Sequence, residues 1–399
     1  MTLISKIQEL SEKYYDEVVR IRRHLHQHPE LSYKEYQTSE FIKSELEKAG
    51  LTYRTIFNTG ITGELTGSIS GPVIALRADI DALPVQEKND LSYKSLTNGV
   101  MHACGHDVHT ASLLGTLKIL NELKDNISGT IKFIFQPAEE KLPGGAKQLI
   151  EAGVLEDPKP DLIIGQHVYP DLPAGTIGLK PGPYMASTDE IFLTIRGKGG
   201  HGALPHKLND TVLAASQIIC ALHQNINRYA PAYIPTVISF GKIIGNGATN
   251  VIPDEVSIDG TFRTMSETWR AKAHQLIKET AEAIGATHGA ECLVNIKKGY
   301  PVLDNDEAMT TKISEFSREY LGENNIKNLE IRMTAEDFAY YTHKIPGAFF
   351  RLGTGNTEKG INSPLHSSTF NIDETALKTG MGNMAWLAIN FLKASEKSN

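Results

Sequence analysis

A cysteine and a histidine stand one residue apart, Cys104 and His106, in the segment HACGHD at residues 102–107. A thiolate and an imidazole are soft to borderline donors, which suit zinc, cobalt, manganese or nickel better than magnesium or calcium. A Cys-x-His pair alone is weak support for a metal site, because such pairs also occur in proteins that bind no metal. The pair gains weight only if other parts of the chain supply further donors.

Further candidate donors follow two short apolar segments. Glu139 and Glu140 come directly after the apolar segment 131–135, and His167 follows the segment 162–164. Adjacent residues that leave a strand point in different directions, so one carboxylate can bind metal while the other faces a water molecule. A metal lowers the pKa of its bound water, and a nearby carboxylate can then remove a proton from it.

Each of these residues alone has an ordinary explanation. The two glutamates would make a solvated acidic turn, and His167 a hydrogen-bonded core residue. His366 lies in a polar stretch near the C-terminus, where an isolated histidine also needs no metal. Only the combination of all four positions along the chain indicates a metal centre.

Helices that alternate with short apolar strands predict an α/β fold with a mainly parallel sheet for residues 1–185 and 302–399. The segments 73–76, 131–135 and 162–164 are its expected buried strands, and a helix is expected from about Asp107 to Leu123. Such folds place their ligands at the carboxyl ends of strands, where Asp79, Glu139 and His167 fall. We therefore expect residues 1–185 and 302–399 to form a catalytic, metal-binding domain.

Residues 186–301 have a different texture and form an expected second domain. Their pattern predicts the order strand, helix, strand, strand, helix, strand, which is typical of a ferredoxin-like sandwich. Because the α/β pattern resumes after Pro301, this domain is expected to be inserted into the larger one.

The overall composition excludes several classes of protein. The formal net charge of −7 disfavours nucleic acid or an anionic membrane as the partner. The apolar stretches are too short to cross a bilayer, and the N-terminus lacks the apolar block of a secretory signal. The three cysteines, Cys104, Cys220 and Cys292, are odd in number and widely spaced, which argues against a disulfide framework. We expect a cytoplasmic protein in which Cys220 and Cys292 are buried.

Several motifs extend over nearly the full chain: RHLHQHPEL at 23–31, RADIDALP at 77–84, HACGHD at 102–107, QPAEE at 136–140, GGHG at 199–202, NVIP at 250–253, GTFR at 260–263 and LH at 365–366. In these motifs the chain closely resembles the family of co-catalytic metal aminoacylases and carboxypeptidases. It is most similar to the branch of hippurate hydrolases, N-acyl-amino-acid amidohydrolases and indole-acetyl-amino-acid hydrolases.

This resemblance implies two divalent metal ions, manganese, zinc, cobalt or nickel, held by five residues: Cys104, His106, Glu140, His167 and His366. Five side chains that serve two metals with at least three ligands each must share one, and Cys104 is the expected bridge. The resemblance also implies that Glu139 is the general base.

Arg77 and Asp79 indicate which branch of the family the chain resembles. Other branches of the family have a ligand histidine where Arg77 stands, and an arginine cannot bind the metal. Asp79 is retained, and we expect it to orient a ligand histidine through a hydrogen bond that fixes the tautomer.

The resemblance assigns three further residues on the inserted domain. It implies that His201 enters the active site of a partner subunit and stabilises the oxyanion, so a homodimer with a closing lid domain is expected. Asn250 and Arg263 resemble the residues of the family that contact the substrate carboxylate and carbonyl. Arginine suits a carboxylate because it binds it through two parallel hydrogen bonds. The ordinary alternatives are that His201 is a loop histidine beside glycines and that Arg263 is a surface strand arginine in an ion pair.

The predicted reaction is hydrolysis of the amide bond of an N-acyl amino acid with an acetyl, benzoyl or similar acyl group. A metallo-carboxypeptidase or dipeptidase would use the same metals and differ in the substrate pocket. In a third interpretation Cys104 is a nucleophile with a neighbouring histidine as base. That interpretation leaves four residues without a role: Glu139, Glu140, His167 and His366. A catalytically silent binding protein on the same scaffold is the fourth, although Glu139 and the expected ligands are all present.

Overall fold

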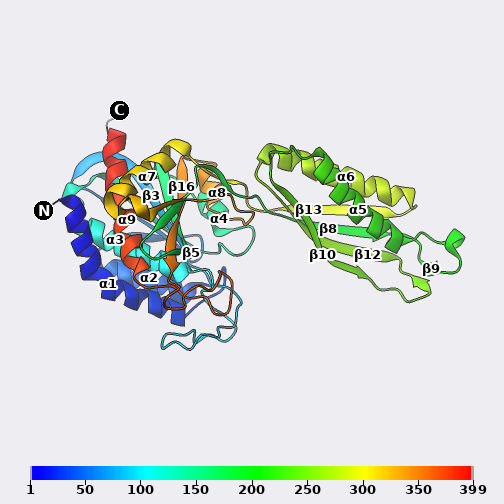
Figure 1. Ribbon diagram of the computed structural model, residues 1–399, viewed down its shortest axis with the longest axis horizontal. Helices are drawn as coiled ribbons and strands as arrows, with labels where there is room; N and C mark the ends of the chain where they lie inside the picture. Colours follow the sequence, from blue (N-terminus) through cyan, green and yellow to red (C-terminus); the bar gives the residue numbers. More distant parts are fainter. Residues whose placement is uncertain (1, 397–399) are drawn as a thin grey trace. The chain divides into compact units, whose positions relative to one another are not determined.

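The computed structural model describes residues 2–396, which form two compact units (Figure 1). The larger unit comprises Met1–Gly182, Asp304–Glu330 and Asp337–Asn399, and the smaller one Pro183–Leu303 and Ile331–Glu336. The segment 331–336 was expected in the larger domain. It belongs to the smaller unit because it pairs with the start of that unit: Arg332 N–H donates to the Tyr184 carbonyl at 2.9 Å, and Ala186 N–H to the Arg332 carbonyl at 3.0 Å.

An eight-stranded sheet forms the centre of the larger unit, with the strand order β1-β2-β4-β3-β5-β16-β6-β15. Its strands are β1 (Tyr53–Ile56), β2 (Gly60–Thr66), β3 (Ile69–Asp79), β4 (Ser128–Gln136), β5 (Leu162–Pro173), β6 (Ile177–Leu179), β15 (Ile326–Asn328) and β16 (Gly347–Gly355). β3 runs parallel to β4 and β5, and β5 runs parallel to β16, whereas β1 and β2 are antiparallel. The predicted α/β fold with a mainly parallel sheet is confirmed.

Helices cover this sheet; they are α1 (Leu3–Gln27), α2 (Tyr36–Lys48), α3 (His106–Glu122), α4 (Gly145–Glu151), α7 (Glu307–Leu321), α8 (Ala339–Thr342) and α9 (Ala376–Glu396), with short 3-10 turns at Lys124–Asn126 and Glu323–Asn325. α3 and α9 pack against each other and against β3, and α1 packs on both of them. Alternate residues of a strand face opposite sides. On β16, Ala348 and Phe350 join the core beneath these helices, while Phe349 faces the other side and packs on Phe338 with ring centroids 5.0 Å apart.

The smaller unit contains a four-stranded antiparallel sheet with the order β10-β12-β8-β13. Its elements are β8 (Asp189–Arg196), α5 (Thr211–Tyr229), β10 (Thr236–Gly245), β12 (Glu255–Thr264), α6 (Glu267–Thr287) and β13 (Glu291–Lys298), with a 3-10 turn at Pro205–Lys207 and the short strands β9 (Gly200–His201) and β11 (Val251–Ile252). The first strand lies between the third and the fourth, as expected for a ferredoxin-like sandwich. The strands β7 (Gly182–Met185) and β14 (Leu303–Asn305) lie where the chain passes from one unit to the other.

One face of α5 supplies the core of the smaller unit, with Ala214, Ile218 and Leu222 fully buried. Cys220 lies on the opposite face and is exposed, so the prediction that it is buried was wrong, whereas Cys292 is buried as expected. Within residues 2–396, no helix combines the length and apolar character that crossing a membrane requires.

Candidate metal centre

The carboxyl ends of neighbouring parallel strands bring the predicted polar residues to one edge of the sheet. β3 ends at Asp79, and β4 ends at Gln136, three residues before Glu139. Asp79 lies opposite Gln136 in the parallel register of these two strands. The turn that carries the glutamates therefore begins beside Asp79.

His167 comes from the next strand, but not from a loop. β5 was expected to end at Ile164, whereas it continues through His167 to Pro173 because it pairs with β16 along this stretch. His167 is 5 % exposed and lies opposite Arg351 of β16. A strand position fixes the backbone beneath this imidazole more firmly than a loop would.

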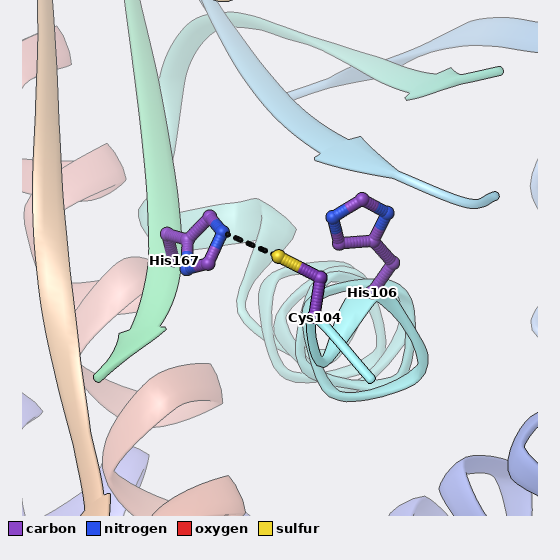
Figure 2. Close-up of side chains that lie close together, drawn as sticks. All are labelled: Cys104, His106 and His167. Atoms are coloured by element: carbon purple, nitrogen blue, oxygen red, sulfur yellow. Dashed lines mark hydrogen bonds between the residues drawn. The ribbon is translucent and has the colours of Figure 1, made fainter. Parts of the chain in front are cut away.

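Gly105 lies between Cys104 and His106, the first residue of helix α3. It has a left-handed φ of 79°, and a Cβ atom there would lie 2.5 Å from Val168 Cγ2 on β5. Only glycine permits this close approach and this conformation together. The approach brings Cys104 Sγ to 3.4 Å from His167 Nε2, with His106 on the first turn of α3 beside them (Figure 2).

Hydrogen bonds fix which nitrogen of each histidine is available. His167 Nδ1 donates to the Val168 carbonyl at 2.8 Å, which leaves Nε2 facing Cys104. His106 Nδ1 donates to Asp81 Oδ1 at 3.1 Å, which leaves its Nε2 free to face the glutamates, 3.9 Å from Glu140 Oε1. Both imidazoles therefore direct their Nε2 atoms toward the same space, as metal-binding histidines do.

His366 completes the group from the C-terminal part of the chain. Its backbone has a left-handed φ of 63°, and its N–H donates to the Ala103 carbonyl at 2.8 Å. This contact brings His366 Nε2 to 3.4 Å from Glu140 Oε1. The imidazole is the most accessible of the group, with a side chain 55 % exposed.

The five predicted ligands form two triads that share one residue. Cys104, His106 and His167 offer donor atoms within 4.8 Å of one another, and so do Cys104, Glu140 and His366. Glu139 belongs to a further such group with His106 and Glu140. The structure thus brings together all five residues and Glu139.

The electrostatics of these triads suit a cation. Burial, together with the charges of Glu140 and Glu139, raises the pKa of the Cys104 thiol well above its ordinary range. Burial opposes a charge on His106, but Asp79, Asp81 and Glu140 outweigh it and raise the pKa of that imidazole to about 10. Among the described residues, His106 Nε2 and Glu140 Oε1 are buried with no hydrogen-bond partner. Buried polar atoms are rarely left in this state, so orphaned nitrogen and oxygen atoms beside a thiol fit a divalent transition metal.

Asp79 makes a different contact from the expected one. His109 Nδ1 donates to Asp79 Oδ1 at 2.5 Å, and the Val168 N–H donates to His109 Nε2 at 2.9 Å. Asp79 also accepts from Arg77 at 2.7 Å and comes no closer than 3.6 Å to His106 Nε2. Asp79 therefore orients His109, which holds the backbone of Val168, the residue that accepts from the ligand candidate His167.

The acceptor for His106 Nδ1 is Asp81, a residue that the sequence patterns did not single out. Two aspartates two residues apart after an apolar strand, Asp79 and Asp81, were a usable signal in the sequence. In the structure both side chains are almost completely buried.

The other three predicted residues belong to the smaller unit. His201 and Asn250 are exposed and lie side by side, since β9 pairs with β11 and Gly202 N–H donates to the Asn250 carbonyl at 2.8 Å. Arg263, on β12, is half-buried, and its Nη1 donates to the Met333 carbonyl at 3.1 Å. Burial lowers the pKa of this guanidinium.

A parallel-sheet unit with thiol, imidazole and carboxylate donors beside a buried glutamate defines a metal-binding hydrolase. Residues 75–389 match the model of Peptidase family M20/M25/M40, and the chain belongs to this family. It is 40% identical over 382 residues to N-acetylcysteine deacetylase of Bacillus subtilis, which covers 95% of this chain and 98% of the relative. It is 39% identical over 395 residues to thermostable carboxypeptidase 2 of Saccharolobus solfataricus, which covers 98% and 99% of the two chains.

A solved structure gives the same assignment. The chain is 36% identical to the Bacillus subtilis YXEP protein, described as a dinuclear metal-binding peptidase of the M20 family. The TM-score is 0.82, and the match covers 96% of this chain and 99% of the other. The resemblance predicted from the motifs is confirmed, and the chain is a metal-binding amidohydrolase.

Proposed function

We propose that this enzyme hydrolyses the amide bond of N-acyl amino acids at two divalent metal ions. Cys104, His106 and His167 would hold one ion and Cys104, Glu140 and His366 the other, with Cys104 as the bridge. The observation that carries this proposal is the pair of donor triads that share Cys104. The thiolate, imidazole and carboxylate donors suit manganese, zinc, cobalt or nickel.

Glu139 is the proposed general base. When bound, divalent ions supply a water of lowered pKa and polarise the carbonyl of the substrate. Glu139 lies in one group with His106 and Glu140, so its carboxylate is placed to take the proton of that water. The same carboxyl group then returns the proton to the nitrogen of the departing amine.

His201 is the proposed donor to the oxyanion, in the active site of a partner subunit. Its Nδ1 accepts the Ala203 N–H at 3.1 Å, so the proton of the neutral ring is on Nε2. An exposed Nε2–H that is already oriented can donate where negative charge develops. With this role the smaller unit would act as lid and dimerisation domain, and Asn250 and Arg263 would contact the substrate carboxylate and carbonyl.

The substrate class follows from the amidohydrolase branch and is consistent with a relative named N-acetylcysteine deacetylase. A carboxypeptidase activity is the second candidate, because an equally similar relative is named thermostable carboxypeptidase 2. We place the enzyme in the cytoplasm, where the three free cysteines would stay reduced.

The electrostatics of Cys104 disfavour the nucleophile interpretation. A catalytic cysteine needs a lowered thiol pKa, whereas burial and the neighbouring carboxylates raise that of Cys104. A bound cation would reverse this balance and favour the thiolate as a ligand.

The test is hydrolysis of N-acetyl and N-benzoyl amino acids and dipeptides by the full chain loaded with manganese, zinc, cobalt or nickel. Glu139→Gln is expected to keep its metal and lower kcat by about 10² to 10⁴-fold. A metal-loaded Glu139→Gln variant with most of its activity would refute the role of Glu139. Activity that survives complete metal removal and disappears on thiol alkylation would instead support the cysteine nucleophile.

A further inference from the structure

The turn that carries Glu139 has a strained backbone. Ala138, directly before Glu139, has a left-handed φ of 54°. Residues other than glycine adopt this conformation only where the surrounding structure holds them in it. The Ala138 carbonyl accepts from Gly145 N–H at 2.9 Å, which restrains the peptide group between Ala138 and Glu139. The group that holds the N–H of Ala138 restrains the preceding peptide group, and the two restraints together set the backbone from which the Glu139 side chain extends.

The Ala138 amide is held by Glu35, from the N-terminal part of the chain. Glu35 Oε1 accepts the N–H of Ala138 at 2.9 Å and that of Tyr33 at 2.8 Å, and Oε2 accepts the Thr59 hydroxyl at 2.8 Å. Glu35 stands at the N-cap position of α2, yet its side chain makes no capping bond to that helix. The side chain is fully buried, so its three hydrogen bonds are made without competition from solvent.

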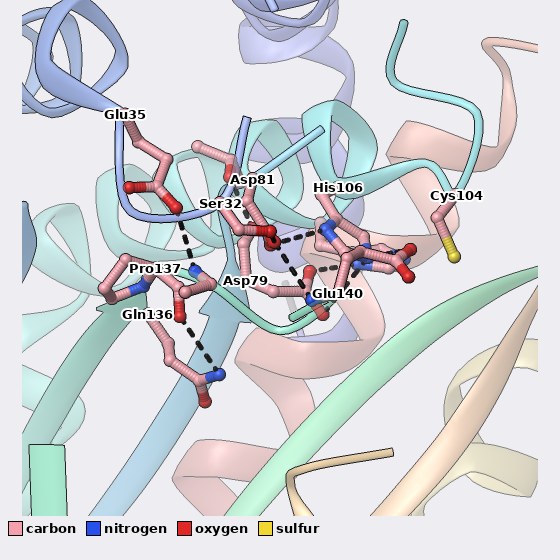
Figure 3. A network of polar contacts seen from close by, with 12 residues as sticks. Ser32, Glu35, Asp79, Asp81, Cys104, His106, Gln136, Pro137 and Glu140 are labelled. Carbon is pink, nitrogen blue, oxygen red and sulfur yellow. Dashed lines mark hydrogen bonds and ion pairs between the residues drawn. The ribbon is translucent and has the colours of Figure 1, made fainter. Parts of the chain in front are cut away.

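The amide on the other side of Glu139 is held by Asp81. Asp81 Oδ2 accepts the Glu140 N–H at 3.0 Å and the Ser32 hydroxyl at 2.6 Å, while Oδ1 accepts from His106 Nδ1 (Figure 3). Burial and the nearby charge of Asp81 raise the pKa of Glu35 to about 7, consistent with two carboxylates that approach the turn together. The backbone N–H groups of the two neighbours of Glu139, Ala138 and Glu140, are thus each bound to a buried carboxylate.

We propose that Glu35 and Asp81 are positioning residues that hold the turn 138–140 from its two sides and thereby fix the direction of Glu139. Asp81 also ties the turn to His106, so the base and the metal donors keep a fixed spacing. This inference rests on the proposed role of Glu139 as the general base. Neither residue is assigned contact with the substrate.

The hydrogen bonds of Glu35 and Asp81 predict different effects when each carboxylate is replaced by the matching amide. At Glu35, both backbone donors are on one oxygen, and the other oxygen faces only a hydroxyl, which can either donate or accept. A glutamine can therefore replace Glu35 without losing a hydrogen bond. At Asp81, each oxygen faces an N–H donor, so the NH₂ group of an asparagine would oppose either Glu140 N–H or His106 Nδ1–H.

The experiment compares Glu35→Ala, Glu35→Gln and Asp81→Asn in the full manganese-loaded chain. Readouts are kcat and KM on an N-acetyl amino acid, and the manganese affinity from calorimetry. Glu35→Ala is expected to lower kcat by roughly 10 to 100-fold with KM within about twofold, because a displaced catalytic group slows the chemical step. Glu35→Gln is expected to stay within about threefold of wild type. Asp81→Asn is expected to weaken manganese binding about 10 to 100-fold, because the ligand histidine loses its orienting partner.

Glu45→Ala is the matched control. Glu45 is a fully buried carboxylate of α2 that bonds to Arg20 and Lys48 and, within residues 2–396, to no group of the turn 138–140, so its loss should lower stability without lowering kcat. If Glu35→Ala does not fold, Thr59→Val removes a single hydrogen bond of Glu35 and is expected to lower kcat by about threefold with KM unchanged.

Three results would overturn the inference: an unchanged kcat in Glu35→Ala (or in Thr59→Val, if that replaces it), equal losses in Glu35→Ala and Glu35→Gln, or an equal loss in Glu45→Ala. Failure of the proposed function would look different. In that case Glu139→Gln itself would retain its activity, whereas failure of this inference leaves Glu139→Gln inactive and Glu35→Ala active.

Discussion

Replacing Glu35 by glutamine is expected to stabilise the larger unit, and the gain should grow with pH. Burial and the charge of Asp81 raise the pKa of Glu35 from its ordinary 4.5 to about 7. Between these two values the folded chain holds a proton that the unfolded chain has released. The stability of the wild type therefore falls as pH rises through this window, and the whole penalty is present above pH 7. Glutamine cannot ionise, so the Glu35→Gln variant does not lose this stability as pH rises.

The size of the effect follows from the displacement of the pKa. One unit of pKa corresponds to about 1.4 kcal/mol, so a rise from 4.5 to about 7 amounts to roughly 3 kcal/mol. The difference in unfolding free energy between Glu35→Gln and wild type should thus increase by about 2 to 3 kcal/mol from pH 5 to pH 8. Any hydrogen bond weakened by the substitution shifts this difference equally at every pH and leaves the slope unchanged.

Urea denaturation of the metal-free chain at pH 5, 6, 7 and 8 measures this difference. The chain has two tryptophans, Trp386 on α9 of the larger unit and Trp269 on α6 of the smaller one. In a Trp269→Phe background the fluorescence therefore reports the unfolding of the larger unit alone. Trp386 is 8 % exposed and should change its emission strongly on unfolding.

Glu45→Gln is the control for this titration. Burial opposes its ionisation, but hydrogen bonds from Lys48 and Arg20 outweigh burial and lower the pKa of Glu45. Its contribution is lost only as pH falls below the ordinary range of a glutamate, so the Glu45→Gln difference should be flat from pH 5 to pH 8. A flat difference for Glu35→Gln as well would refute the reasoning about Glu35.

Three further predictions concern other parts of the chain. Asp189→Ala removes a carboxylate that accepts from Arg270 Nε at 2.9 Å, His274 Nε2 at 2.6 Å and Gly299 N–H at 3.1 Å. Because it removes the fully buried carboxylate partner of the Arg270 guanidinium and leaves the partly exposed Glu267 to pair with it, it should destabilise the smaller unit by about 3 kcal/mol, and an unchanged urea midpoint of Trp269 fluorescence in a Trp386→Phe background would contradict this. Gly105→Ala places a Cβ 2.5 Å from Val168 Cγ2 at a left-handed φ, so it should lower the melting temperature and weaken manganese binding at least about tenfold in calorimetry. Removing manganese with a chelator should destabilise the larger unit by about 3 kcal/mol for each ion lost, or roughly 5 kcal/mol for the two proposed ions, relative to manganese at 100 times its Kd. Trp386 should report that loss and Trp269 should not.

The fold was largely predictable because each unit carries a simple periodicity. The buried strands 73–76 and 131–135 are short apolar runs between helical patterns, which predict a parallel sheet. The errors fell where pairing partners come from distant segments. β5 continues past its apolar part because β16 pairs with it, and the segment 331–336 joins the smaller unit through Arg332. Neither partner is marked by the local sequence.

Candidate metal donors can be selected from the sequence because the chemistry of a metal site depends on residue type. Cys104, His106 and Glu140 stand out as side chains that bind transition metals, and their place beyond apolar strands implies a shared edge of the sheet. The orientation of each donor was not predictable in the same way. Asp79 was expected to orient a ligand histidine, and the structure shows Asp81 bonded to His106 and Asp79 to His109.

Glu35 could not be predicted from the sequence because the group that it binds in the turn is a backbone N–H. Glu35 lies 103 residues before Ala138, and the group that it binds there is a main-chain N–H, which nearly every residue possesses. No residue type marks such a contact, so a pattern of side chains cannot reveal it. The strained φ of Ala138 does reveal it, because a left-handed alanine must be held by its surroundings. In our proposal the direction of Glu139 depends on two buried carboxylates, Glu35 and Asp81, and such residues are found through the backbone N–H groups that they hold.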